Sequence, residues 1–231
     1  MFSIKKKLLT AGAAAALAVT LTGCHAVMYF QQEVMGFDAS GYVEATLDCQ
    51  YKAEFQEYKK LTKSTDEEAA NIYEEGMEAE SISFEYFYNV TLNDDDRAKV
   101  IDMYKLLYTK AQYTVGEAVR NKSGSADRYM VEVRVKPLQI FDNIQSDYEV
   151  FWEEFSGRYT EEELLAMTNS EQEGYISAYV GGVINLINRH IDTVTYGEET
   201  AIQVRVEETT DGFYEMNKQD FQAVDMAIIA Y

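Results

Sequence analysis

The side chains best suited to nucleophilic or metal chemistry are few in this 231-residue chain, which contains two cysteines and two histidines. Cys24 and His25 are adjacent near the N-terminus, whereas Cys49 and His190 stand apart from any partner in the sequence. Zinc sites and nucleophile–base pairs need several such groups at defined spacings. We therefore expect no metal, no cofactor and no catalytic residue of these types. We interpret His190 as a capping or surface residue at the end of a helix, where the helix dipole favours a cation, with a role as a ligand or base as the alternative.

Cys49 lies on an amphipathic helical pattern, which favours a buried structural side chain, with a reactive thiol as the alternative. The acidic run from Asp94 to Asp96 lacks the alternating spacing and the glycine of a calcium loop. Acids are favoured in the first turn of a helix by the helix dipole, so this run predicts a helix start.

The N-terminal segment has the pattern of an export signal. Three lysines at positions 5–7 precede an uncharged stretch from Leu8 to Gly23. That stretch is shorter than the roughly 20 apolar residues needed to span a membrane. It ends in Leu21-Thr22-Gly23-Cys24, which resembles the bacterial lipobox. The resemblance implies cleavage before Cys24 and lipid on its thiol. The alternative is an uncleaved or conventionally cleaved signal peptide, in which Cys24 is an ordinary thiol.

Lipid on Cys24 divides the chain into a signal peptide (1–23), a short membrane-proximal tether (24–39) and an exported domain (40–231). Two acyl chains give stable anchoring, at about 0.8 kcal/mol per buried methylene. We therefore expect a cell-membrane protein that faces the extracellular side. Removal of residues 1–23 leaves 17 basic and 40 acidic residues. Screening confines repulsion from an anionic membrane to about 8–10 Å, so the lipid dominates.

The acidic composition excludes some partners and leaves others open. Nucleic-acid binding depends on Lys and Arg that neutralise phosphates, so we expect none here. An acidic surface favours solubility, and binding of a cation or a basic partner is the alternative. At 47% hydrophobic and 13% aromatic residues, the chain is too apolar to be disordered. Lipidation of Cys24 would leave Cys49 without a disulfide partner, and a domain of this size needs none.

Apolar residues that recur at spacings of three and four predict several helices. Ser64 with Glu67 and Thr65 with Glu68 form overlapping capping boxes at the start of one of them. Gly181-Gly182 lies inside another, which indicates close helix packing or a kink, with approach of a ligand as the alternative. The predicted helices cover 41–62, 64–88, 93–111, 147–155, 160–167, 170–190 and 217–229.

Alternating apolar residues predict two β-hairpins. Val131, Val133 and Val135 follow a predicted loop at 121–128, and Pro137 ends this strand. The second hairpin covers 193–216, with its turn at Asp211-Gly212. Segments 131–135 and 202–206 align at an offset of 71 residues, which suggests duplication of 93–141 as 170–216. The predicted fold class is α+β, in which an antiparallel sheet from two hairpins packs against several amphipathic helices.

Several helix and strand motifs carry a resemblance beyond the lipobox. They are Gly41-Tyr42-Val43-Glu44-Ala45, Ala53-Glu54-Phe55-Gln56-Glu57-Tyr58, residues 74–80, Arg134-Val135-Lys136-Pro137 and Asp211-Gly212-Phe213-Tyr214. Together these resemble uncharacterised Gram-positive lipoproteins of the Firmicutes. That family is similar in layout to the cystatin-like and nuclear-transport-factor-like cone folds, which house small-molecule pockets, a few enzymes and many non-catalytic modules. The resemblance therefore implies an architecture and leaves the activity open.

Aromatic residues are the main candidates for a binding surface. Phe84-Glu85-Tyr86-Phe87-Tyr88 surrounds a predicted helix with rings, and Trp152 lies in another predicted helix. The ring-rich segment is either buried between two layers or lines a pocket or partner surface. Tyr86, Tyr88 and Trp152 are our candidates for such a surface, because Tyr and Trp combine contact area with a polar group.

Catalytic motifs are missing from the sequence, which lacks a Gly-x-Ser-x-Gly elbow, a phosphate-binding glycine loop and a dinucleotide fingerprint. Acid pairs such as Glu153-Glu154 point apart on a helix. We therefore expect a lipid-anchored cell-envelope lipoprotein that is not an enzyme and binds an envelope protein, a peptide or a glycan. One alternative is a cone-fold enzyme or small-molecule carrier with its pocket between helices and sheet. Another is an accessory subunit of a membrane complex.

Overall fold

Side-chain caps mark the starts of most helices in this computed structural model, which describes residues 36–123, 126–210 and 212–231. Thr65, Thr160 and Thr168 each accept a hydrogen bond from the N–H three residues later, and the glutamate at that position accepts one from the threonine N–H. Such boxes satisfy amides that the helix leaves unpaired. Three more helices are capped by a side-chain oxygen alone, from Asp38, Asn93 and Asn217.

The helices follow the predicted order with some changed limits. They are α1 (Ala39–Lys52), α2 (Gln56–Thr62), α3 (Asp66–Tyr88), α4 (Asp94–Tyr108), α5 (Ile140–Ser156), α6 (Glu161–Ala166), α7 (Asn169–His190), the 3₁₀ turn η1 (Ile191–Thr193) and α8 (Lys218–Ile228).

The prediction of one helix over 41–62 is wrong, because the chain breaks between α1 and α2. Ala53 adopts a left-handed conformation with φ of 56°, and its N–H bonds to the carbonyl of Asp48. After this turn, Tyr58 of α2 packs in a small core with Cys49 of α1 and Ala69 of α3. Both helices bury apolar residues at helical spacing, so the pattern runs across the break without revealing it.

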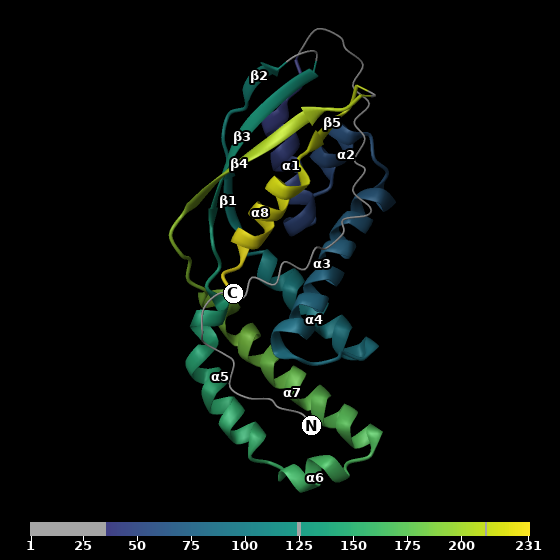
Figure 1. The fold of residues 1–231 in the computed structure, drawn as a ribbon, viewed down its shortest axis with the longest axis vertical. Coiled ribbons are helices and arrows are strands. Elements are labelled where there is room, and N and C mark those ends of the chain that lie inside the picture. The colour runs from purple at the N-terminus through teal and green to yellow at the C-terminus, as the bar shows by residue number, and fades with distance from the viewer. Residues whose placement is uncertain (1–35, 124–125, 211) are drawn as a thin grey trace.

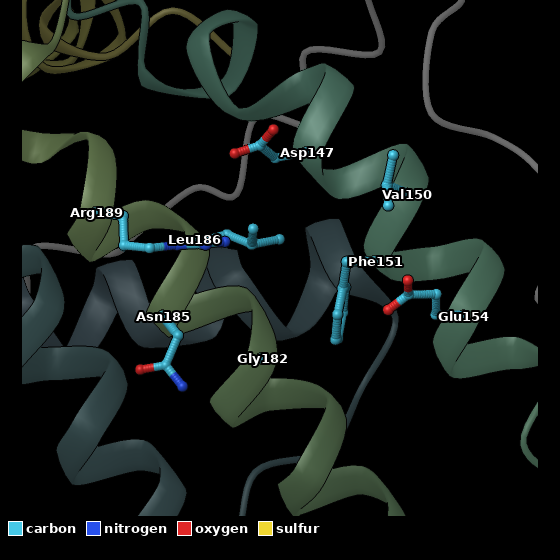
Figure 2. Close-up of a pocket in the computed structure, with 8 residues that line it drawn as sticks. All are labelled: Asp147, Val150, Phe151, Glu154, Gly182, Asn185, Leu186 and Arg189. Atoms are coloured by element: carbon cyan, nitrogen blue, oxygen red, sulfur yellow. The ribbon is translucent and has the colours of Figure 1, made fainter.

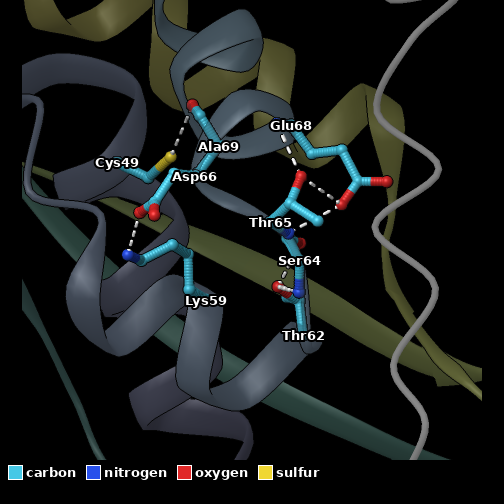
Figure 3. A network of polar contacts seen from close by, with 8 residues as sticks. All are labelled: Cys49, Lys59, Thr62, Ser64, Thr65, Asp66, Glu68 and Ala69. Carbon is cyan, nitrogen blue, oxygen red and sulfur yellow. Dashed lines mark hydrogen bonds and ion pairs between the residues drawn. The ribbon is translucent and has the colours of Figure 1, made fainter.

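Figure 3 shows how α3 begins. Of the two overlapping boxes, the one formed by Thr65 and Glu68 is confirmed. The box proposed for Ser64 is wrong, since its hydroxyl lies 2.5 Å from that of Thr62. The thiol of Cys49 is buried in the same region and donates a hydrogen bond to the carbonyl of Ala69 at 3.6 Å. This contact matches the structural interpretation of Cys49.

Helix α5 begins at Ile140, earlier than the predicted 147. Its preceding residue, Gln139, makes no side-chain cap, so the sequence carries no start signal there. The start of α5 is instead stabilised by hydrogen bonds with Thr195, which lies in a distant segment of the chain. Thr195 accepts the N–H of Gln139 at its carbonyl, and its own N–H donates to the side chain of Asn143.

The five strands form one antiparallel sheet, which confirms the predicted fold class. They are β1 (Gln112–Val115), β2 (Val119–Ser123), β3 (Ala126–Lys136), β4 (Thr200–Glu208) and β5 (Tyr214–Met216), in the order β1-β3-β4-β5. Strands β1 and β2 both pair with β3, one with each half of it. The predicted loop at 121–128 is too long, since pairing of β2 with β3 continues to Ser123 and Ala126, and residues 124–125 between them lie outside the described residues.

The segments that align at an offset of 71 residues are neighbours in this sheet. Val131 lies opposite Val204, and Val133 lies opposite Ile202. The pairing is compatible with a duplication of the helix–hairpin unit, which stays a prediction.

Strand alternation places the core on one face of the sheet. Val131, Val133 and Val135 are buried, as are Val204 and Val206 on the neighbouring strand. Helices α1 and α8 contact β3, and α8 also contacts β4. Figure 1 shows that the molecule is elongated, with the sheet, α1 and α8 toward one end and α5, α6 and α7 toward the other. We call the segment 140–190, which comprises α5, α6 and α7, the helical arm.

Candidate functional site

The helical arm is built on a continuous row of aromatic rings. Helices α5 and α7 pack against each other along its length, and α6 joins them at its end (Figure 1). Tyr179 of α7 stacks with Phe151 and contacts Phe155 of α5, with ring centroids 6.0 and 5.5 Å apart. The hydroxyls of Tyr148 and Tyr179 share a hydrogen bond of 2.7 Å in the buried interior. Ring packing of this kind adds specific geometry to apolar burial, so it holds the two helices in a fixed relation.

Gly182 lets the two helices approach closely. A Cβ atom at this position would lie only 2.3 Å from the ring of Phe151. Figure 2 shows this ring between the two helices, facing the backbone of Gly182. The close-packing interpretation of Gly181-Gly182 is therefore confirmed at Gly182, whereas a Cβ at Gly181 would meet nothing within 4 Å.

A groove of about 390 Å³ lies between α5 and α7 on the surface of the arm. Figure 2 shows its lining, which combines apolar and polar side chains from both helices. The residues that line it are Asp147, Val150, Phe151, Glu154, Gly182, Asn185, Leu186 and Arg189. Val150 is 59% exposed, so an apolar side chain faces water beside two carboxylates. We call this surface the α5–α7 groove.

A second, smaller groove of about 250 Å³ lies near the junction with α6. Tyr159, Met167 and Tyr175 contribute to it, and the guanidinium of Arg158 stands over the ring of Phe155 at 4.9 Å. A cation in contact with a ring is stabilised by the ring's electron-rich face. The arm therefore carries two apolar depressions with polar borders.

The three aromatic residues chosen from the sequence are not brought together into one surface. Tyr88 is buried and contacts Phe84, Tyr148 and Tyr179. Trp152 is half-buried in α5, with its ring 5.8 Å from that of Tyr179. Tyr86 is 63% exposed on α3. Phe84 and Tyr88 thus follow the buried interpretation of the ring-rich segment. A ligand-binding role for Tyr86, Tyr88 or Trp152 stays a prediction.

The other chemistry-bearing residues have structural surroundings. His190 ends α7 and its Nε2 lies 3.0 Å from Oδ2 of Asp147 at one end of the α5–α7 groove. The acidic run 94–96 forms the first turn of α4, as predicted. Within the described ranges, no group of three or more His, Cys, Asp or Glu residues is placed to hold a metal ion. Cys24, the candidate lipid attachment site, and His25 lie outside the described residues.

A cluster of tyrosines and carboxylates, which the sequence did not single out, joins four separate segments. Glu80 of α3 accepts a hydrogen bond from Tyr108 of α4 at 2.5 Å and one from Tyr231 at 3.0 Å. Asp225 of α8 accepts a hydrogen bond from Tyr51 of α1 at 2.8 Å. We call these five residues the tyrosine–carboxylate cluster. In the part of the chain that the structure describes, both carboxylates have tyrosine hydroxyls rather than Lys or Arg as recorded partners.

Burial changes the acidity of this cluster. Burial and the nearby charge of Asp225 raise the pKa of Glu80 to about 7, although the hydrogen bonds from Tyr108 and Tyr231 act to lower it. Burial likewise raises the pKa of Asp225, against the effect of the hydrogen bond from Tyr51. Burial also raises the pKa of Tyr51 and Tyr108, so both stay protonated donors. A carboxyl group that titrates near neutral pH is a candidate for pH-dependent behaviour or for proton transfer.

A weak signal in the sequence could have pointed to this cluster. Glu80 lies between Met77 and Phe84 in sequence, at the edge of the buried stripe of α3, and Asp225 follows Val224 on α8. An acid that interrupts an apolar stripe is unusual, but a side chain at the margin of a stripe can also reach solvent. The pattern therefore could not identify the tyrosine partners.

Comparisons with known proteins give one result, at the level of fold. No family model matches the chain, and no curated protein matches it. A solved structure from Bacillus subtilis subsp. subtilis str. 168, titled a "putative lipoprotein (ycdA)", is similar, with a TM-score of 0.56 and 13% sequence identity. The match covers 84% of this chain and 56% of that protein, so this chain spans little more than half of its neighbour's length. Within the described residues, no helix has the length and apolar character to cross a membrane.

Proposed function

We propose that this protein is an envelope lipoprotein, anchored through lipid on Cys24, that binds a partner with its helical arm and does not act as an enzyme. The observation that carries this proposal is the position of the helical arm at the end of the molecule opposite β5, against which Phe37 packs.

The tether joins the folded domain at the sheet end. Phe37, the second described residue, stacks on Tyr214 of β5 with ring centroids 3.9 Å apart and also contacts Tyr129 of β3. Figure 1 shows β5 at the opposite end of the long axis from α6. Cys24 and Gly36 are twelve positions apart in the sequence, so an extended chain between them spans at most about 40 Å. Lipid on Cys24 would therefore keep the sheet end nearer to the membrane than the arm.

The arm has the properties of a presented binding element. Its interior rings fix the two helices, whereas Val150, Tyr159 and Leu165 remain exposed along its surface. Exposed apolar groups that line a groove favour contact with another molecule. The similarity in fold to the "putative lipoprotein (ycdA)" of Bacillus subtilis supports the anchored part of the proposal.

Each alternative function has one observation in its favour. The raised pKa of Glu80 would suit an enzyme with an acid–base group, but neither groove described above is lined by Glu80 or Asp225. An accessory subunit of a membrane complex would also use an exposed arm. We favour partner binding because the grooves lie on the arm.

The anchor is tested by metabolic labelling. Cells that produce the protein are grown with labelled palmitate, and the wild type is compared with Cys24→Ser. We expect label and membrane association in the wild type only. An unlabelled wild type, or a serine variant that stays equally bound to membranes, would contradict the anchored role.

The arm is tested by photo-crosslinking on intact cells with a matched control. A photoreactive residue replaces Leu165 on α6, and in a second strain replaces Val119 on β2, because the two side chains are 67% and 66% exposed. We expect a discrete crosslinked product from the arm position and none from the sheet position. Equal crosslinking at both positions would contradict a role for the arm.

A further inference from the structure

The α5–α7 groove has a chemical bias that identifies the kind of partner it fits. Residues 140–190 contain ten acidic residues and two of Lys or Arg. Asp147 and Glu154 line the groove beside Val150, and Glu149 and Glu153 are exposed on the same helix. An occupant would therefore meet apolar side chains with carboxylates on the α5 side of the groove.

We infer that this groove binds a cationic amphipathic segment of another polypeptide, an inference that rests on the proposed role of the arm in partner binding. An apolar side chain of the segment would pack against Val150 and Leu186, and a Lys or Arg residue would face Glu154, because Asp147 already contacts His190. A short amphipathic helix laid in a groove is a common mode of peptide recognition.

The shape and charge of the groove disfavour small molecules, a second copy of this chain and anionic polymers as its occupants. The groove is open along the surface, which suits a polypeptide segment better than an enclosed small molecule. A second copy of this chain would bring two acidic arms together, and like charges disfavour that pairing. Anionic envelope polymers are disfavoured for the same reason. Arg189 lines one end of the groove, so the acidic character is strongest toward Glu154.

Trp152 offers a direct readout of binding. It is the one tryptophan of the chain, follows Phe151 on α5 and packs against Tyr179. An occupant of the groove contacts the helix that carries this ring, so its fluorescence should change on binding. The full chain with Cys24→Ser serves as the protein, because it lacks the thiol to which lipid would attach.

The probe is a synthetic 14-residue helical peptide of Lys and Leu with one apolar face, compared with the same peptide carrying Glu in place of Lys. We expect a saturable change in Trp152 emission with the cationic peptide only. The dissociation constant should rise by about tenfold between low and high salt, because charge steers and stabilises the contact.

Two valines of similar exposure provide the matched variants. Val150→Lys places a cation in the groove, whereas Val119→Lys makes the same change in charge on β2, where Val119 is 66% exposed. We expect Val150→Lys to weaken binding by about tenfold, as removal of an apolar contact and addition of a like charge should do, and Val119→Lys by less than about twofold. Glu154→Gln should weaken it by about threefold.

Each other outcome overturns the inference. These outcomes are no response to the cationic peptide, equal binding of the anionic peptide, equal weakening by both lysine variants, concentration-dependent dimerisation through the arm, or a response to a neutral oligosaccharide instead. Because the Cys24→Ser protein is used, such a failure leaves the anchored role open to its own labelling test. Circular dichroism of both lysine variants confirms that each is folded.

Discussion

Two carboxylates on α8 lie five residues apart and have opposite acid–base behaviour. Asp220, in the first turn, accepts hydrogen bonds from Nε and Nη2 of Arg205 at 2.6 and 2.9 Å and from its backbone N–H at 2.9 Å. These bonds lower the pKa of Asp220 despite its partial burial. Asp225, further along, has Tyr51 as its recorded partner, and burial raises its pKa.

The difference shows that burial and the partner together decide how an acid behaves, because burial is the largest influence on the pKa of Asp225 and the hydrogen bond from Arg205 is the largest influence on that of Asp220. A guanidinium stabilises the ionised carboxylate through charge and paired hydrogen bonds. A tyrosine hydroxyl supplies one hydrogen bond and no charge, so it does not compensate fully for burial. The first acid therefore stabilises the fold at neutral pH. The second, with Glu80 beside it, favours the fold when protonated.

The largest effect is expected for Glu80→Gln. The pKa of Glu80 is about 7 in the folded protein and 4.5 when unperturbed, so between these values the folded state binds more protons than the unfolded state. The free energy of unfolding of the wild type should therefore fall as pH rises from 4.5 to 7. Glutamine does not ionise, so the Glu80→Gln variant lacks this loss of stability at high pH. Its free energy of unfolding should exceed that of the wild type by about 2–3 kcal/mol at pH 8 and by little at pH 4.5. Urea denaturation across this pH range measures it.

Glu75→Gln is the matched control, because Glu75 is exposed on the same helix. It removes the same charge from the acidic protein without touching the cluster. Parallel pH profiles for wild type and Glu80→Gln would contradict the assignment of this loss to Glu80.

The next effect has the opposite sign. Asp220→Ala should destabilise the protein at pH 7 by about 2 kcal/mol, because Arg205 loses both side-chain bonds and its backbone N–H loses an acceptor. Asp220→Asn, which keeps one acceptor, should cost about half as much. The pKa of Asp220 is lowered, so this stability is present above pH 3.8 and lost as pH falls through the lower folded value. Chemical denaturation at pH 7 and pH 3 measures the destabilisation caused by Asp220→Ala and distinguishes its pH dependence from that of Glu80→Gln. A destabilisation that is larger at pH 3 than at pH 7 would contradict this prediction.

The smallest effect is expected for Asp225→Asn. Removal of this charge should lower the pKa of Glu80, which Asp225 raises, and stabilise the fold by about 1 kcal/mol at pH 7. The carboxyl carbon signal of Glu80, followed by NMR titration, should move to a more acidic midpoint. Asp102→Asn, at an exposed position on α4, should leave the midpoint in place. An unchanged midpoint in Asp225→Asn would show that the charge of Asp225 does not influence the pKa of Glu80.

Much of the fold follows from local patterns. The alternation at 131–135 and 202–206 predicted the two central strands, and the capping box of Thr65 and the acidic run at 94–96 predicted two helix starts. Helix caps and the periodicity of apolar residues depend on residues that are close in the sequence, so the sequence shows them directly. The start of α5 was missed because its support comes from Thr195, which lies in a distant segment.

The candidate site was harder to predict for the same reason. Trp152 and the ring-rich segment pointed to aromatic contacts, but burial of Tyr88 and exposure of Tyr86 depend on which neighbours cover each ring. The groove needs Phe151 and Gly182 at one crossing of two helices.

The sequence by itself determined several helices, the two central strands and the acidity of the chain, whereas the export signal and the lipobox stay predictions. These properties depend on composition and on short spacings. Only the tertiary structure decided that Glu80 meets Tyr108, that Asp225 meets Tyr51 and that α5 and α7 enclose a groove. Those contacts join segments far apart in the chain, and packing of the whole core selects them.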